Sequence, residues 1–502
     1  MRSYSIMTDI SHKSDPHDDF DNRLNQQMRP PEGQRLDFHC LRFAEVFKLE
    51  DYGKLEAGLD RLYSENIKSS RFYVRQEQER YKEFLSNSKK AFMSGGWANI
   101  RGFVSRTFAE AHGYRIMDSC VRELPPGVSS LSFFVSHMLP SMIVVVTRAI
   151  YDDSVSAQLN ELLLEQCSER IEKKTDSEMH IPVSVVKAEK IGTFINHQQD
   201  LVETFLANYC TGEFLSDDKR DNGCKCPSIK LYSLQDIPFT PVDKLTDWLK
   251  VYGHFIQLFG DWPISFSTYQ FANEYLLFER GIFKRGERPV DICVLTSESL
   301  FKAPEVHQMY GSVAAAIKYR YETGFDNFLS LLAIDQLLQV SIGVAIKHRN
   351  RLDEYSIDSD SSLESKAKQY NNIYNAKIVV NDDYFDFLRF HQELEYITSA
   401  EAERWLLKET ANFELLENLY NQPDFARSLV SNMRHLASLL DKTFALLNTR
   451  YSDLFESVSS LSNFAVADSA NRYQKKLSIL TWALFILTVV IVVLMIVQFI
   501  AK

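Results

Sequence analysis

The stretch that decides the architecture of this protein runs from Arg472 to Lys502 and reads RYQKKLSILTWALFILTVVIVVLMIVQFIAK. From Leu477 to Ile500 it contains no charged residue, no glycine and no proline. About 20 apolar residues suffice to cross the hydrocarbon core of a bilayer. We therefore expect residues 477–500 to form a single transmembrane helix, which makes the lipid bilayer the first predicted partner.

Basic residues flank this segment unequally. Arg472, Lys475 and Lys476 precede it, whereas only Lys502 follows it. Because cytoplasmic flanks carry the excess of lysine and arginine, we expect a single-pass protein of the inner (cell) membrane. Its N-terminal bulk would then be cytoplasmic and its C-terminus outside. Trp482 lies where an aromatic ring anchors a span at the membrane interface.

Weakly polar side chains recur along one face of the predicted span. Ser478, Thr481 and Thr488 carry hydroxyls, and at spacings of three or four residues they share a stripe with the apolar Phe485, Val492, Met495 and Phe499. Such spacing places them on one stripe of a helix. Either this stripe lines a narrow pore together with Asn471, or its hydroxyls bond to carbonyls of their own helix. One helix encloses nothing by itself, so a pore requires a homo-oligomer, which we expect to have four or more subunits.

A long helical stalk is expected before the span. Pro423 is the last proline of the sequence and Gly343 the last glycine, so no helix breaker follows residue 423. Apolar residues recur in heptads from Leu429 to Ala465, with Leu439 and Leu446 widening the apolar face. Residues 399–419 have the pattern of another helix. We expect a helical hairpin and coiled-coil-like stalk over residues 373–476.

The rest of the chain predicts a mixed α/β cytosolic body of the α+β class. We expect a polar, disordered leader over residues 1–35, the body over 36–352 and a linker over 353–372. Strands are predicted at residues 131–138, 142–150, 180–188, 229–234, 290–296 and 376–381. Helices are predicted at residues 54–66, 71–92, 155–173, 197–209, 241–259, 265–279, 309–321 and 326–348. The last of these carries Asp335 and is interpreted as a buried core helix. Strands and helices do not alternate regularly, which favours the α+β class.

Composition excludes several functional classes. The net charge of −11, without a long basic run, argues against bulk nucleic acid as a partner. Seven scattered cysteines, an odd number, are typical of reduced thiols rather than of a disulfide framework. The sequence contains none of the common nucleotide-binding, hydrolase or metalloprotease motifs. We therefore expect no enzymatic activity and no cofactor.

One cluster of carboxylates has two interpretations. Asp382, Asp383 and Asp386 follow the predicted strand at residues 376–381. They would cap the N-terminus of a helix there, where negative charge is favourable. The alternative is a divalent-cation site shared between subunits.

The residues that enter the span resemble those of a known family. Asn471, Lys475, Lys476, Leu477, Ser478, Ile479 and Thr481, together with the long helix before them, resemble the stalk and first membrane helix of CorA-like divalent-metal channels. The resemblance implies a homo-oligomer, pentameric in that family, whose long helix lines a funnel and pore. The sequence has neither the Gly-Met-Asn loop nor the second membrane helix of that family, so magnesium selectivity is not implied. Divergent proteins of this kind resemble membrane effectors of bacterial antiviral (anti-phage) defense, whose cytosolic domain senses a small nucleotide.

These features lead to two functional hypotheses. The first is an oligomeric membrane channel or pore-forming effector, in which ligand binding to the cytosolic domain gates ion transport through a CorA-like pore. The second is a tail-anchored membrane scaffold or binding module that conducts nothing.

Overall fold

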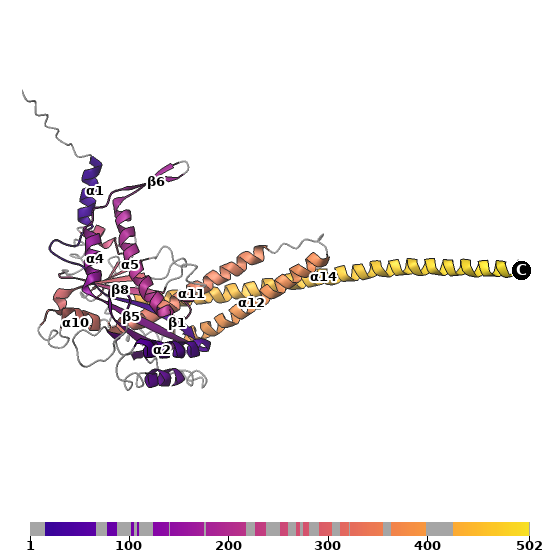
Figure 1. The fold of residues 1–502 in the computed structure, drawn as a ribbon, viewed down its shortest axis with the longest axis horizontal. Helices are drawn as coiled ribbons and strands as arrows, with labels where there is room; N and C mark the ends of the chain where they lie inside the picture. The colour runs from indigo at the N-terminus through magenta and orange to yellow at the C-terminus, as the bar shows by residue number, and fades with distance from the viewer. Residues whose placement is uncertain are drawn as a thin grey trace, which may run out of the picture. The chain divides into compact units, whose positions relative to one another are not determined.

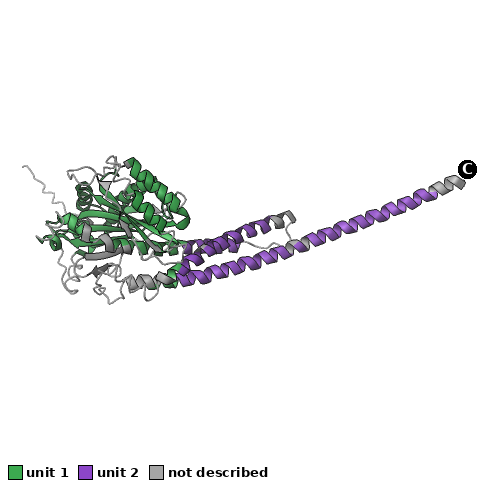
Figure 2. Ribbon diagram, turned by 90° about the horizontal axis from the view of Figure 1, so that it is seen from below, with its two compact units in different colours: residues 1–340, 393–435 green, residues 341–392, 436–502 purple. Residues whose placement is uncertain are grey.

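The computed structural model describes residues 16–66, 78–87, 102–104, 108–109, 124–139, 141–174, 177–216, 226–236, 252–259, 268–271, 275–280, 291–303, 312–320, 322–354, 363–397 and 425–500. The chain divides into two compact units. Unit 1 comprises residues 1–340 and 393–435, and unit 2 comprises residues 341–392 and 436–502 (Figure 2).

Unit 1 is built on one mixed sheet, to which the described residues contribute nine strands. The order across the sheet is β2-β4-β5-β1-β8-β11-β10-β9, and β3 pairs with β4. Figure 1 labels β1, β5 and β8 of this sheet. These strands are β1 (Asp37–Lys48), β2 (Gly102–Val104), β3 (Phe108–Ala109), β4 (Val128–Leu139), β5 (Met142–Tyr151), β8 (Ser228–Leu234), β9 (Thr268–Phe271), β10 (Tyr275–Arg280) and β11 (Asp291–Ser297). Neighbouring strands in the described part of this sheet run antiparallel, except that β8 and β11 run parallel to each other.

Helices and a small hairpin complete the fold. The labelled helices are α1 (Pro16–Gln27), η1 (Leu49–Asp51), α2 (Tyr52–Asn66), α4 (Asp153–Leu164), α5 (Val183–Ala207), η3 (Glu298–Phe301), α10 (Val313–Arg320), α11 (Glu322–Glu354), α12 (Leu363–Ile397) and α14 (Phe425–Ile500). Residues 78–87 and 252–256 are also helical. The hairpin consists of β6 (Arg170–Lys174) and β7 (Ser177–Ile181), which form a separate two-stranded sheet. The predicted mixed α+β class is confirmed.

Strand β1 lies in the middle of the sheet, between β5 and β8. Every residue from Phe38 to Phe47 is buried, so both faces of this strand are covered. Its aromatic and β-branched residues suit a strand. However, three polar residues, His39, Arg42 and Glu45, interrupt the apolar pattern of this strand. For this reason β1 was not predicted from the sequence.

A buried ion triad ties α11 to this sheet. Arg42 on β1 and Arg148 on β5 lie directly opposite each other in the strand register. Both contact Asp326 on α11: Arg42 Nη1 lies 3.3 Å from Asp326 Oδ1, and Arg148 Nη2 binds Asp326 Oδ2. All three side chains are at most 3% exposed. Burial raises the pKa of the Asp326 carboxyl, and the two guanidiniums act in the opposite direction.

Several predicted elements differ from the structure. Residues 180–188 are the end of β7 followed by α5, because Pro182 stands at the N-cap of the helix. The predicted helix at 265–279 is replaced by strands β9 and β10, which pair with each other. The predicted strand at 376–381 lies within α12, where its apolar residues occupy helix positions.

The predicted disordered leader is helical over part of its length. Residues 16–27 form α1, and the side chain of Asn25 bonds both the carbonyl and the amide of Cys167 at 2.7 and 3.0 Å. Met28 is fully buried. A polar composition predicted disorder, but these few buried contacts hold the segment against unit 1. Residues 1–15 lie outside the described part of the chain, as does the predicted helix at 399–419.

Within the part of the chain that the structure describes, two helices are long and apolar enough to cross a membrane. In α11 the candidate segment Phe328–Glu354 is 67% buried, as expected of a core helix. In α14 the candidate segment Val466–Val493 is 0% buried. The same helix is buried along one face earlier in unit 2, at Leu440, Phe444, Leu447, Tyr451 and Val458.

Unit 2 packs α14 against parts of α11 and α12. The Tyr451 hydroxyl donates to the carbonyl of His348 at 3.0 Å, and the rings of Phe455 and Tyr370 lie 4.9 Å apart. The buried positions of α14 recur at heptad spacing, as predicted, although Leu439 and Leu446 are 50% and 53% exposed. A coiled-coil stalk formed between subunits stays a prediction.

We predict that removing the carboxylate of the triad strongly destabilises unit 1. Asp326→Ala leaves two buried guanidiniums without this counter-ion, which typically costs about 3–5 kcal/mol. Hydrogen exchange of the β1 and β5 amides measures the loss. The control replaces all three partners (Arg42→Met, Arg148→Met, Asp326→Leu) and should recover most of the protection. Equal protection in the wild type and in Asp326→Ala would contradict a structural role for this triad.

Candidate functional site

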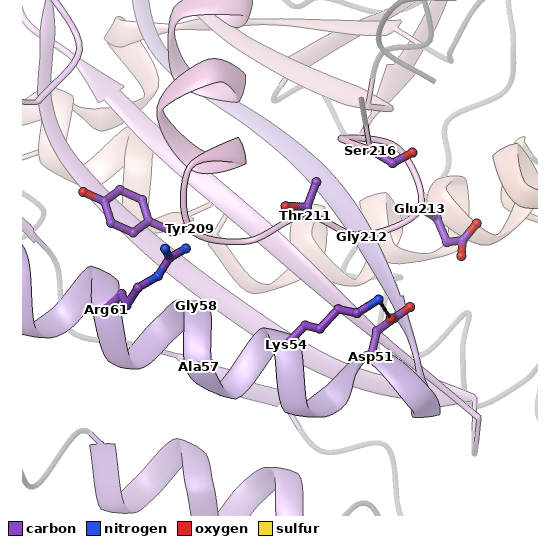
Figure 3. A pocket seen from close by; sticks show the side chains of 10 residues that line it. All are labelled: Asp51, Lys54, Ala57, Gly58, Arg61, Tyr209, Thr211, Gly212, Glu213 and Ser216. Atoms are coloured by element: carbon purple, nitrogen blue, oxygen red, sulfur yellow. Dashed lines mark hydrogen bonds and ion pairs between the residues drawn. The ribbon is translucent and has the colours of Figure 1, made fainter. Parts of the chain in front are cut away.

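A polar cleft of about 460 Å³ opens in unit 1 between α2 and the loop that follows α5 (Figure 3). Small-molecule sites in proteins usually have volumes of this order. One wall comes from η1 and α2 and carries Asp51, Lys54, Ala57, Gly58 and Arg61. The other comes from the loop and carries Tyr209, Thr211, Gly212, Glu213 and Ser216.

Glycines allow two close backbone contacts here: Gly58 lets the two walls approach each other, and Gly212 lets the loop wall approach β1. A Cβ atom at Gly58 would lie 1.9 Å from the carbonyl oxygen of Tyr209, and a Cβ atom at Gly212 would lie 2.3 Å from that of Val46. Any side chain at either position would displace the backbone. Lys54, Gly58 and Arg61 are three or four residues apart and so share the face of α2 that meets the loop.

The loop wall is fixed to β1 by a buried carboxyl group. Glu45 accepts hydrogen bonds from the backbone amides of Val46, Phe214 and Leu215 at 3.0, 2.7 and 2.7 Å. The amide of Glu213 also donates to the carbonyl of Val46 at 2.8 Å. The loop thereby continues the hydrogen bonding of β1 beyond the point where β8 ceases to pair with it.

Burial raises the pKa of Glu45 to about 8, although its three backbone donors act in the opposite direction. The thiol of Cys226 lies 3.8 Å from Glu45 Oε2, and burial raises the pKa of the neighbouring Cys210 to about 12. The raised pKa of Cys210 means that its thiol is not activated as a nucleophile. Glu45 therefore acts as a structural clamp that titrates near neutral pH.

Charged groups of both signs line the cleft. Arg61 donates to the carbonyl of Asn208 at 2.7 Å and lies over the ring of Tyr209, and Lys54 lies 2.6 Å from Asp51 (Figure 3). Glu213 lies 3.4 Å from Lys48. Together with the hydroxyls of Thr211 and Ser216, these groups suit the binding of a small polar ligand. Their arrangement contains no paired nucleophile and base.

A second polar cluster lies at the end of β8. Nε2 of His39 is 2.7 Å from Oγ of Ser233, and the Ser233 hydroxyl donates to Glu298 Oε1 at 3.1 Å. Burial raises the pKa of the nearby Asp37 to about 6, and Arg35 opposes this shift. Ser233 is fully buried, so no substrate reaches its hydroxyl. The cluster joins β1, β8 and η3 by a chain of hydrogen bonds.

The predicted pore-lining residues all lie on the exposed part of α14: Asn471, Ser478, Thr481, Phe485, Thr488 and Val492. The hydroxyls of Thr481 and Thr488 donate to the carbonyls of Leu477 and Leu484, at 2.8 Å each. Backbone bonding by these two hydroxyls was one of the two interpretations of the stripe. At the predicted interface, Arg472 pairs with Asp468 at 2.9 Å, while Lys475, Lys476 and Trp482 are exposed.

The predicted carboxylate cluster lies in the middle of α12 and not at a helix start, so the capping interpretation was wrong. Asp383 pairs with the buried His348, Oδ2 to Nε2 at 2.6 Å. The side chain of Asp386 lies outside the described part. Among described residues, no group of three or more His, Cys, Asp or Glu side chains is placed to hold a metal ion.

The cleft was not found by sequence analysis. Its residues come from two segments about 150 positions apart in the chain, so no local motif connects them. Three residues could have pointed to the cleft: Gly58 and Gly212, which stand at tightly packed positions, and Glu45, a charged residue within β1.

We predict a pH dependence of stability that depends on Glu45. Its pKa is about 8 in the folded protein against an ordinary value of 4.5, so the folded state binds this proton more tightly. The contribution is fully present below pH 4.5 and is lost as the pH rises through 8. Urea unfolding from pH 5 to 9 should show a steeper decline for the wild type than for Glu45→Gln. Parallel curves would contradict the assignment.

Comparison with known proteins gives no match: no family model, no curated protein and no solved structure matches this chain.

Proposed function

We propose that the protein is an oligomeric membrane channel or pore-forming effector whose body binds a ligand and gates a pore formed by α14. The observation that carries the proposal is the contrast within α14. The helix buries one heptad face in unit 2, yet its segment Val466–Val493 is wholly exposed. Such an extended apolar surface is not sustained in water and is typical of a membrane or protein contact.

The dimensions of the exposed segment fit a bilayer. Its uncharged part continues from Leu477 to Ile500, and these 24 residues span about 36 Å as a helix, enough to cross a hydrocarbon core of about 30 Å. Arg472, Lys475 and Lys476, which precede the uncharged part of the segment, favour an orientation with unit 1 and the part of unit 2 before the span in the cytoplasm of the cell. In this orientation the polar cleft of unit 1 faces cytoplasmic metabolites.

Assembly from identical subunits follows from the single span. Four or more copies would surround an axis, with the stripe from Ser478 to Val492 facing it. The resemblance of residues 471–481 to CorA-like channels supports a ring of this kind and a possible role in antiviral defense. No resident metal is needed for this arrangement.

The polar cleft between α2 and the loop at residues 209–216 is our candidate for the ligand site. Its mixture of Lys54, Arg61 and hydroxyl groups suits a phosphorylated small molecule, and a nucleotide-type defence signal is our proposed class. Gating requires that the ligand bind the conducting arrangement more tightly than the closed one.

The alternative function, a tail-anchored scaffold without conductance, is favoured by one observation. Thr481 and Thr488 satisfy their hydroxyl donors on the backbone of α14. A helix with such bonds can face lipid without an unsatisfied donor. The stripe therefore does not require an aqueous surface.

We predict that conductance depends on which face of α14 is altered. Thr481→Trp enlarges a stripe residue, whereas the control Val490→Trp places the same side chain on the opposite face, about 180° away at 100° per residue. In planar bilayers Thr481→Trp should reduce single-channel conductance several-fold, and Val490→Trp should leave it unchanged. Both variants should assemble as the wild type does, by mass photometry. If the assembled wild type conducts nothing, or if the two variants change conductance equally, the pore hypothesis is contradicted. The tail-anchored scaffold would then be the remaining function.

A further inference from the structure

Exposed apolar side chains of unit 1 gather around one region. Of the large apolar residues that are exposed in its described part, all but Leu300 lie on α1, the end of α4, the β6–β7 hairpin or the first turn of α5. These are Phe20, Leu164, Ile171, Met179 and Val185, with exposed fractions of 55, 54, 54, 41 and 42%. In the hairpin Ile171 is paired with His180 and Met179 with Glu172, so Ile171 and Met179 lie on opposite faces. We call the set without Met179 the apolar surface. Exposed apolar residues concentrated in this way mark interaction sites.

Hydrogen bonds and ion pairs show that these segments are neighbours in space. Asn25 of α1 bonds Cys167, and Arg29 donates to the carbonyl of Leu164 at 3.3 Å. Arg170 of β6 pairs with Glu189 of α5 at 2.9 Å. The region is therefore held together by interactions across α1, α5 and the hairpin, which Figure 1 shows at one end of unit 1.

A cleft of about 420 Å³ opens within the apolar surface. Phe20, Leu24, Pro182 and Val183 supply its apolar lining. Its charged lining consists of Asp21, Glu169 and His180. Glu169 Oε1 lies 2.7 Å from His180 Nδ1, and its amide donates to Asp21 Oδ2 at 3.4 Å. The cleft thus combines an apolar interior with two carboxylates.

The hairpin beside the cleft offers backbone groups for pairing. Within the described residues, β6 and β7 pair with each other and with no strand of the main sheet. Two-stranded hairpins have two open edges, and an open edge is a template for an added strand. An extended peptide on this edge would place alternate side chains toward the cleft.

We propose that this surface binds an extended segment of a partner protein that carries a large apolar side chain next to a lysine or arginine. The apolar side chain enters the cleft, and the cation faces Asp21 and Glu169. A second copy of this chain is a poorer occupant, because contact between two identical surfaces brings these carboxylates together. The proposal is independent of whether α14 forms a pore.

Selection from a random peptide-display library on the full-length protein in nanodiscs tests the proposal. The enriched peptides should share a large apolar residue beside a lysine or arginine. Fluorescence anisotropy with the best synthetic peptide should show affinity reduced about tenfold or more by Phe20→Asp and by Ile171→Asp, as for a buried anchor. The matched control is Leu300→Asp, at an exposed apolar residue on η3 (43% exposed), which should bind as the wild type does.

A second comparison tests the charge. Replacing the basic residue of the peptide by glutamine should weaken binding to the wild type, and Asp21→Asn should reduce that difference. Unchanged thermal unfolding of each variant excludes misfolding as the cause. The proposal is overturned if no peptide is enriched, if enriched peptides are acidic, or if Phe20→Asp and Leu300→Asp affect binding equally.

Discussion

The structure of unit 1 depends on the way in which two buried arginines are neutralised. Arg42 and Arg148 lie directly opposite each other on adjacent central strands, and like charges in this arrangement repel. Asp326 on α11 contacts both, so this helix supplies a carboxylate that offsets their repulsion. On the opposite face of β1, Glu45 holds the loop that forms one wall of the polar cleft. One strand thus fixes a core helix on one side and the candidate site on the other.

Helix α14 is governed by a different constraint. Its heptad face is covered in unit 2 by residues of its own chain, so the side chains at Leu440, Phe444 and Tyr451 are not available for a contact between subunits. Association of subunits would therefore use other surfaces, chiefly the exposed segment Val466–Val493. This moves the proposed site of assembly from the stalk toward the membrane. It also gives the stripe from Ser478 to Val492 more weight in our account than the coiled-coil pattern that precedes it.

Much of this fold was predictable wherever a periodic pattern reflects a simple environment. The apolar run of α14, the strands β4, β5, β8 and β11 and the buried helix α11 all follow from their hydrophobic periodicity. Strand β1 was missed because its buried Arg42 and Glu45 are explained only by partners some 170 to 280 residues away. The strand predicted at 376–381 was wrong because a short apolar run does not distinguish strand from helix. The cleft at α2 was not predictable from local motifs, since tertiary packing alone brings its two walls together.

The central claim is that α14 gathers several copies of this chain around an axis in a membrane. The most direct test is the number of subunits in the full-length protein, reconstituted in nanodiscs and weighed by mass photometry. Our account predicts a closed ring of four or more copies. A monomer or dimer under these conditions would contradict it, because too few helices would then surround an axis to form a pore.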